Sequence, residues 1–202
     1  LAEFLSSQGV HATFFMVGRF ATERPDIVAR VRELGHAIGN HTYDHPQMSE
    51  FAAAGADVVG QIARTDAVLG HSDGPIFVRP PYGTWDGAVA SALNGNLTTA
   101  LRHVGPVGWD IDGRDWQFWK DDRDPNDCVA EYIREVDDKR RGILLMHDSS
   151  ADQEFVRRRN RTFEVVRTLI PELKARGYQF VPLHAVPGIA GGQRPATLDY
   201  LT

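Results

Sequence analysis

The chain has 202 residues, a formal net charge of -5, and a content of 42% hydrophobic and 24% charged residues. These values predict one soluble globular domain spanning residues 1–202, with a loop-like tail over residues 184–202. The negative charge disfavours nucleic acid as a partner, since phosphate binding requires a basic surface. No apolar run has the length of a membrane span, and the one cysteine, Cys128, excludes an internal disulfide. We expect a monomer.

Strands and helices alternate along the chain, which begins within a helical pattern. Apolar, β-rich runs predict strands over residues 11–17, 37–39, 76–78, 107–111, 143–146 and 178–181. Helical spacing predicts a helix that Thr22 caps and Gly35 ends, followed by helices over residues 49–69, 85–93, 129–136 and 163–175. This alternation predicts an α/β fold with a parallel sheet, either a barrel or an open doubly wound sheet.

Polar side chains follow four consecutive predicted strands. They are His41 and His45 after the second strand, Arg79 and Tyr82 after the third, Asp112 and Asp115 after the fourth, and His147 after the fifth. The carboxyl ends of parallel strands in α/β barrels carry the active site. The pattern therefore predicts an enzyme whose reactive groups share one rim of the sheet.

The two histidines in His41-Thr42-Tyr43-Asp44-His45 are four residues apart. On a helical turn, side chains at this spacing project from the same face and can reach one cation. Pro46 would end such a turn, which places the pair at a loop edge. Two imidazoles suit zinc or a similar metal, with a carboxylate as third ligand; the alternative is a pair of ordinary loop histidines.

Arginines are concentrated in the run Arg157-Arg158-Arg159-Asn160-Arg161, which precedes a predicted helix. Such a run is typical of a solvated helix entry, and binding of a polyanion is the alternative. No glycine-rich phosphate-binding pattern occurs in the chain, so the sequence does not favour nucleotide chemistry.

Four motifs occur in order, each separated from the next by at least one predicted helix: HTYDH (41–45), RPPYG (79–83), DGRDW (112–116) and LLMHD (144–148). Together they resemble the polysaccharide deacetylase family, carbohydrate esterase family 4, over residues 1–183. The resemblance implies a distorted parallel β/α barrel of about seven strands. It also implies a secreted, periplasmic or cell-envelope location, because the substrates of the family belong to cell walls.

One feature of the family pattern is not found in this sequence. Members carry a Thr-Phe-Asp-Asp-Gly type segment on the first strand, which supplies a metal-ligand carboxylate and the carboxylate base. No such segment precedes residues 11–17, so we expect it upstream of Leu1. The alternative is a protein that has lost this strand and its activity. Asp121-Asp122 is less suited as a substitute, because it falls in a charged turn.

The resemblance assigns a role to each motif residue. His41 and His45 would bind Zn²⁺, or Co²⁺ or another divalent transition metal. His147 would be the general acid, with Asp115 as its carboxylate partner. Arg79 would pair with the catalytic carboxylate, and the backbone N–H of Tyr82 would stabilise the oxyanion. Pro81, Trp116 and Leu144 would line the substrate groove.

These roles imply a metal-dependent hydrolase that removes N-acetyl groups from N-acetylglucosamine-containing chitin, chitooligosaccharide or peptidoglycan. Two alternatives stay open. One is an O-acetyl esterase acting on acetylxylan with the same machinery. The other is a carbohydrate-binding relative without catalysis, which would lack the Asp-Asp pair.

Overall fold

The computed structural model describes residues 1–70, 74–97, 102–149, 152–186 and 189. The chain forms two compact units. The N-terminal unit comprises Ala2–Gly108 with Val181–Thr202, and the C-terminal unit comprises Leu1 with Trp109–Phe180. No helix in the described ranges combines the length and the apolar composition needed to cross a bilayer.

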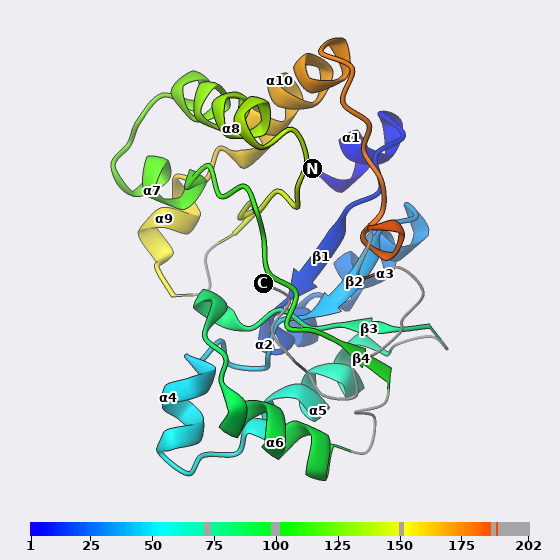
Figure 1. Cartoon of the computed structure of the whole chain (residues 1–202), viewed down its shortest axis with the longest axis vertical. Coiled ribbons are helices and arrows are strands. Elements are labelled where there is room, and N and C mark those ends of the chain that lie inside the picture. The colour runs from blue at the N-terminus through cyan, green and yellow to red at the C-terminus, as the bar shows by residue number, and fades with distance from the viewer. Residues whose placement is uncertain (71–73, 98–101, 150–151, 187–188, 190–202) are drawn as a thin grey trace. The chain divides into compact units, whose positions relative to one another are not determined.

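Short parallel strands build the sheet region of the N-terminal unit (Figure 1). They are β1 (Thr13–Met16), β2 (Ala37–Asn40), β3 (Ile76–Phe77) and β4 (His103–Val104). β1 pairs with β2 and β3 pairs with β4, and a bridge between Asn40 and Val78 joins the two pairs. Because every pairing is parallel, the residues that follow these strands lie at the same edge of the sheet.

Helices flank these strands in the N-terminal unit. They are α1 (Ala2–Ser7), α2 (Gly18–Glu23), α3 (Pro25–Glu33), α4 (Met48–Ala53), α5 (Val58–Leu69) and α6 (Gly87–Asn96), with short 3₁₀ turns η1 (Pro81–Gly83) and η3 (Leu183–Ala185). The ends of α5 follow from local chemistry. Asp57 caps its first turn by accepting from the Gly60 N–H, and Gly70 ends it in the left-handed conformation.

Two helices pack against each other in the C-terminal unit: α8 (Pro125–Lys139) and α10 (Thr162–Ala175). Figure 1 also shows the shorter α7 (Asp115–Lys120) and α9 (Glu154–Arg158) of this unit. Apolar side chains from α7, α8 and α10 form one buried core cluster with Ile111, with Tyr132 and Trp119 fully buried inside it.

The α/β class is confirmed, and several predicted elements are confirmed with it. Strands β1, β2 and β3 overlap the predicted runs 11–17, 37–39 and 76–78, and helices α8 and α10 cover the predicted helices 129–136 and 163–175. Closure into a seven-stranded barrel stays a prediction, because the described residues form two sheets of two strands each. Most of the predicted tail, residues 187–188 and 190–202, lies outside the described residues.

Three helix predictions are wrong in their boundaries. Residues 49–69 form α4 and α5 rather than one helix, since Gly55 has a φ of 70° that a right-handed helix does not adopt. Thr22 lies inside α2 and bonds the Gly18 carbonyl, and the next helix begins at Pro25, whose missing N–H is tolerated at a first helical position. The predicted helix 85–93 begins at Gly87, because Asp86 caps it.

Three predicted strands do not form ladders among the described residues. Residues 107–111 and 143–146 share only the parallel bridge between Ile111 and Leu144, and residues 178–181 form no strand. An apolar run indicates burial, whereas a ladder also needs a neighbouring chain in register, which the pattern cannot specify. The Leu145 carbonyl instead accepts a hydrogen bond from the Tyr132 hydroxyl at 2.6 Å.

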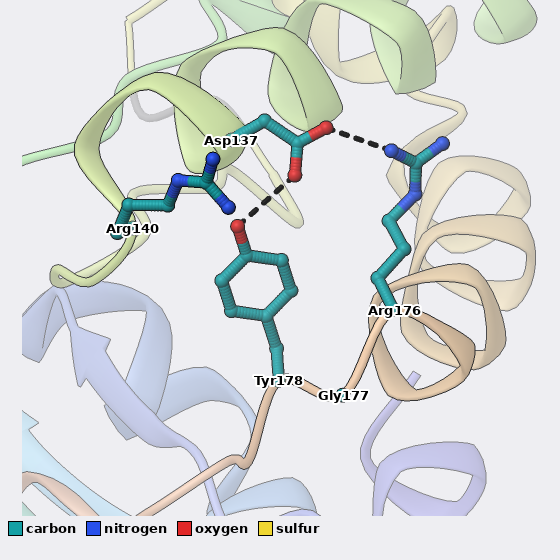
Figure 2. Close-up of a pocket in the computed structure, with 5 residues that line it drawn as sticks. All are labelled: Asp137, Arg140, Arg176, Gly177 and Tyr178. Carbon is teal, nitrogen blue, oxygen red and sulfur yellow. Dashed lines mark hydrogen bonds and ion pairs between the residues drawn. The ribbon is translucent and has the colours of Figure 1, made fainter.

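A second tyrosine hydroxyl, that of Tyr178, is only partly buried in the same unit. Figure 2 shows an open pocket at the carboxyl ends of α8 and α10, in which Tyr178 donates to Asp137 at 3.0 Å. Arg176 bonds the other oxygen of Asp137 at 2.7 Å. These contacts join the ends of the two helices, and water can replace them more readily than the buried bond of Tyr132.

Replacing Tyr132 with Phe should therefore lower the free energy of unfolding by about 1–3 kcal/mol, because the buried Leu145 carbonyl loses its side-chain donor. The matched variant Tyr178→Phe should cost less than about 1 kcal/mol, since its hydroxyl bonds are only partly buried. Urea unfolding of both variants measures the difference. Equal losses would show that burial of the hydroxyl bond is not what matters.

Candidate active site

His41 and His45 converge at the carboxyl end of β2. Their ring centroids are 5.0 Å apart with an interplanar angle of 73°. The prediction of a helical turn is wrong: residues 41–47 are not helical, and Thr42 and His45 have φ values of 65° and 66°. Two left-handed residues turn the loop so that the rings approach each other, a shape that side-chain spacing alone does not specify.

The backbone of this histidine loop, residues 41–45, has its donors satisfied. Each N–H finds an acceptor, and most of these acceptors are side-chain oxygens. The pairs are His41 to Met16 O (3.1 Å), Thr42 to Asn40 Oδ1 (2.9 Å), Tyr43 and Asp44 to Gln61 Oε1 (3.0 and 2.8 Å), and His45 to Thr42 Oγ1 (3.2 Å). The loop keeps its shape without regular secondary structure because side-chain oxygens accept the hydrogen bonds that a β-ladder would otherwise accept.

Helix α2 holds the other side of the loop. The Gly18 N–H donates to the Thr42 carbonyl at 2.9 Å, and the Arg19 N–H donates to the Tyr43 carbonyl at 3.1 Å. A Cβ at Gly18 would come within 2.6 Å of both Thr65 Oγ1 and the Tyr43 ring. Glycine is therefore required at this position, so that α2 and α5 can both contact the loop.

The His41 ring is oriented by a backbone carbonyl. Its Nδ1 lies 2.6 Å from the Arg79 oxygen, and a carbonyl can only accept, so the hydrogen-bond network assigns the proton of the neutral ring to Nδ1. The lone pair is then on Nε2. Metal-binding histidines are commonly oriented in this way, through the ring nitrogen that does not bind the metal.

The donor set suits a metal with two imidazole ligands. Two adjacent rings, one with its tautomer set by a carbonyl, fit two coordination positions of zinc or cobalt. Within the described ranges, no group of three His, Cys, Asp or Glu side chains is arranged to hold a metal ion. The third ligand therefore stays a prediction.

Arg79 follows β3 and is buried beside the histidine loop. Its guanidinium donates to the Val107 oxygen at 3.0 Å and the Gly108 oxygen at 2.9 Å, and it lies 4.3 Å from the centroid of the Phe15 ring. Burial lowers the pKa of Arg79 to about 10, so the side chain stays charged at neutral pH. Its pairing with a catalytic carboxylate stays a prediction.

Tyr82 lies next to His45 in the rigid turn after Arg79. Pro80 and Pro81 lead into η1, where Tyr82 adopts a φ of 57°. The Tyr82 ring packs edge-on against the His45 ring at a centroid distance of 4.9 Å and is 55% exposed. Pro81 is buried, so its contribution here is to the shape of the turn.

In the C-terminal unit, Asp115 and His147 form a direct pair. His147 Nδ1 lies 2.7 Å from Asp115 Oδ1, and the His147 N–H donates to Asp115 Oδ2 at 2.7 Å. Asp115 is fully buried, whereas the His147 side chain is 37% exposed. The parallel bridge between Ile111 and Leu144 brings their two segments together. The imidazole thus has one nitrogen anchored on a carboxylate.

Two residues that support this pair were not predicted. Asn160 Nδ2 donates to the His147 carbonyl at 2.6 Å, and the Thr162 hydroxyl lies 2.7 Å from that carbonyl and 3.2 Å from Asp115 Oδ2. Asn160 belongs to the arginine run, which ends α9 and leads into α10. Asn160 is the one uncharged residue in a run with four arginines, and this exception is a sequence feature that could have indicated a separate role for it.

The remaining predicted residues of this unit have mixed surroundings. Trp116 is 38% exposed, and Leu144 is partly buried against the core of α7, α8 and α10. Burial raises the pKa of Asp112, although the Arg114 N–H opposes this effect.

The predicted site residues are divided between the two units. His41, His45, Arg79 and Tyr82 belong to one unit, and Asp115 and His147 belong to the other. Their convergence on one rim stays a prediction.

Comparisons with known proteins agree on one family. The sequence model described as polysaccharide deacetylase matches residues 1–99. The chain is 35% identical over 193 residues to a chitooligosaccharide deacetylase from Azorhizobium caulinodans, covering 91% of this chain and 84% of that relative. It is 30% identical over 182 residues to a peptidoglycan-N-acetylglucosamine deacetylase from Bacillus cereus, covering 89% of this chain but only 59% of that relative.

A solved structure shows the same fold. The family 4 acetyl xylan esterase from Clostridium thermocellum, in complex with a cobalt ion, matches with a TM-score of 0.67 and 28% identity. The match covers 90% of this chain and 78% of that one.

Replacing Gly18 with Ala should lower the free energy of unfolding by about 1–3 kcal/mol, because the added methyl group forces Tyr43 or Thr65 to move. Gly87 lies in α6, where an added Cβ would meet no atom within 4 Å, so Gly87→Ala is the matched control. It should be neutral or stabilising by up to about 1 kcal/mol. Urea unfolding compares the two; an equally mild Gly18→Ala would refute the close packing around the loop.

Proposed function

This chain belongs to the polysaccharide deacetylase family, and from this premise we propose that it is a metal-dependent hydrolase of acetylated glycans. The proposed reaction removes N-acetyl groups from N-acetylglucosamine-containing oligosaccharides or polysaccharides. The names of the two relatives, a chitooligosaccharide deacetylase and a peptidoglycan-N-acetylglucosamine deacetylase, support this substrate class. The observation that carries the proposal is the Asp115–His147 pair, an anchored imidazole suited to proton transfer.

His147 acts as the general acid in this proposal. Its Nδ1 is held by Asp115 Oδ1 at 2.7 Å, which leaves Nε2 as the nitrogen that delivers a proton to the departing amine. The carboxylate of Asp115 orients the ring and stabilises its protonated form. Asn160 and Thr162 hold the His147 backbone from the carbonyl side.

His41 and His45 would hold the metal, Zn²⁺ or Co²⁺, with Nε2 of His41 directed by the Arg79 carbonyl. When bound, such an ion polarises the acetyl carbonyl and activates water. The third ligand and the carboxylate base are expected from the family's Asp-Asp-Gly segment, and the buried charge of Arg79 would keep that base ionised.

The turn that carries Tyr82 completes the proposed site. Two prolines and the left-handed Tyr82 give it a preorganised backbone, as stabilisation of an oxyanion requires. Trp116 would line the glycan groove, and Leu144 would contact the acetyl group. Pro81 would shape the turn that carries Tyr82. Substrates of this class belong to cell walls, so we propose a secreted, periplasmic or cell-envelope location.

Hydrolysis of O-acetyl esters is the second candidate. The match to the acetyl xylan esterase from Clostridium thermocellum favours it. An ester needs the same attack on an acetyl carbonyl but less help from the acid, because an alkoxide leaves more readily than the amide anion that an unprotonated nitrogen would form.

Acetate release tests the proposal. Full-length protein with added zinc or cobalt should release acetate from chitooligosaccharides, and His147→Ala should lower turnover by about 10²–10⁴-fold while metal content stays within about twofold. Acetylxylan serves as the ester substrate. Acetate from acetylxylan alone would favour the esterase, and none from either substrate would reject catalysis in favour of a carbohydrate-binding relative.

Replacing His41 with Ala should weaken zinc binding by about 100-fold or more, because one of the two imidazole ligands is lost. His11→Ala is the matched control, since His11 is an exposed histidine whose ring bonds the Gly35 carbonyl. Chelator competition measures both affinities. Wild-type zinc affinity in His41→Ala would show that the ligand assignment is wrong.

A further inference from the structure

A buried polar network lies behind the histidine loop, formed by residues outside the four sequence motifs. Asp66 on α5 accepts from Asn40 Nδ2 through Oδ1 at 2.8 Å, and its Oδ2 lies 2.9 Å from His103 Nε2. Asn40 is fully buried, His103 is 2% exposed and the Asp66 side chain is 11% exposed. A carboxylate and an imidazole are expensive to bury, so their pairing here needs a reason beyond filling the core.

The network determines which way the Asn40 amide points. Its NH₂ group donates to Asp66 Oδ1 and to the Ile62 carbonyl at 2.9 Å, and both of these groups can only accept. The amide oxygen must therefore point the other way, where it accepts from the Thr42 N–H at 2.9 Å. Asp66 thus acts on the histidine loop without contacting either histidine.

Thr42 transmits this constraint to the second histidine. It is fully buried between His41 and His45, has a φ of 65°, and its hydroxyl oxygen accepts from the His45 N–H at 3.2 Å. The Asn40 backbone also joins the β2 end to Arg79, whose N–H donates to the Asn40 carbonyl at 3.0 Å. The His45 backbone is therefore held by Thr42, whose own N–H depends on the Asn40 side chain, and the carbonyl that orients the His41 ring belongs to the residue that bonds the Asn40 backbone.

We propose that Asp66, held by His103, is a positioning residue for the histidine pair. It keeps the Asn40 amide in the orientation that accepts from Thr42, and thereby fixes the left-handed turn that brings the two rings together. The structural part of this inference concerns the metal-free loop. Its consequence for zinc rests on the proposed function, because outer partners of metal ligands alter affinity by about 10–100-fold.

Amide hydrogen exchange on the metal-free, full-length protein tests the structural part. In Asp66→Ala, one N–H of Asn40 loses its acceptor, so the Thr42 and His45 amides should exchange about tenfold faster. The Tyr43 and Asp44 amides are held by Gln61 and should change by less than about threefold. Asp66→Asn should restore the wild-type pattern, because its amide oxygen still accepts from Asn40. Should Asp66→Ala not fold, His103→Leu should give the same pattern more weakly.

A matched control separates positioning from loss of stability. Asp57→Ala removes the cap of the same helix without contacting the loop, so it should destabilise α5 yet leave the Thr42 exchange rate within about threefold of wild type, relative to global unfolding. Uniform acceleration of all four loop amides in Asp66→Ala, or equal acceleration in Asp57→Ala, would overturn the inference.

Zinc affinity gives the second measurement. Asp66→Ala should bind zinc about tenfold more weakly than wild type or Asp57→Ala. Wild-type zinc affinity in Asp66→Ala would overturn the inference for the metal site. A wild-type protein that binds no zinc would instead reject the proposed metal dependence, and the exchange pattern would still decide the role of Asp66.

Discussion

The histidine loop depends on one constraint, that every buried backbone N–H needs an acceptor. The His41 N–H still donates to Met16 of β1, but residues 42–45 leave the sheet and include two left-handed residues, so the backbone of a strand or helix does not supply acceptors for their N–H groups. Side chains of Asn40, Gln61 and Thr42 supply them instead. Because these groups belong to the core around α5, the shape of the loop is tied to the packing of the unit.

In the C-terminal unit, a buried carboxylate supplies the acceptors that fix the segment carrying His147. Asp115 is fully buried, yet its two oxygens make hydrogen bonds with the His147 ring, the His147 N–H and the Trp116 N–H. A buried carboxylate is tolerated when its lone pairs are used in this way. In both units, therefore, a buried hydrogen-bond acceptor determines the position of a partly exposed histidine. The loop that carries the histidine can then do without the hydrogen bonds of a β-ladder.

Local sequence predicted much of the fold, and it failed where distant residues decide. The runs at 11–17 and 37–39 became paired strands, whereas the equally apolar run at 143–146 met Ile111 at a single bridge. For the candidate site, motif order predicted His41, His45, Asp115 and His147, which the structure brings together as two pairs. It did not indicate Gln61, Asp66 or Thr162, because nothing in their own surroundings marks them as partners of residues 17 to 47 positions away.

The sequence by itself determined the α/β class, the end of α5 before Gly70, and the family to which the chain belongs. These features depend on side-chain chemistry within a few residues, or on motifs read in order. Only the tertiary structure decided how the histidines approach each other, which carbonyl orients His41, and which glycine lets two helices contact the loop. Those outcomes depend on contacts between atoms of different helices, strands and loops. Such contacts are determined by the packing of the elements rather than by spacing along the chain.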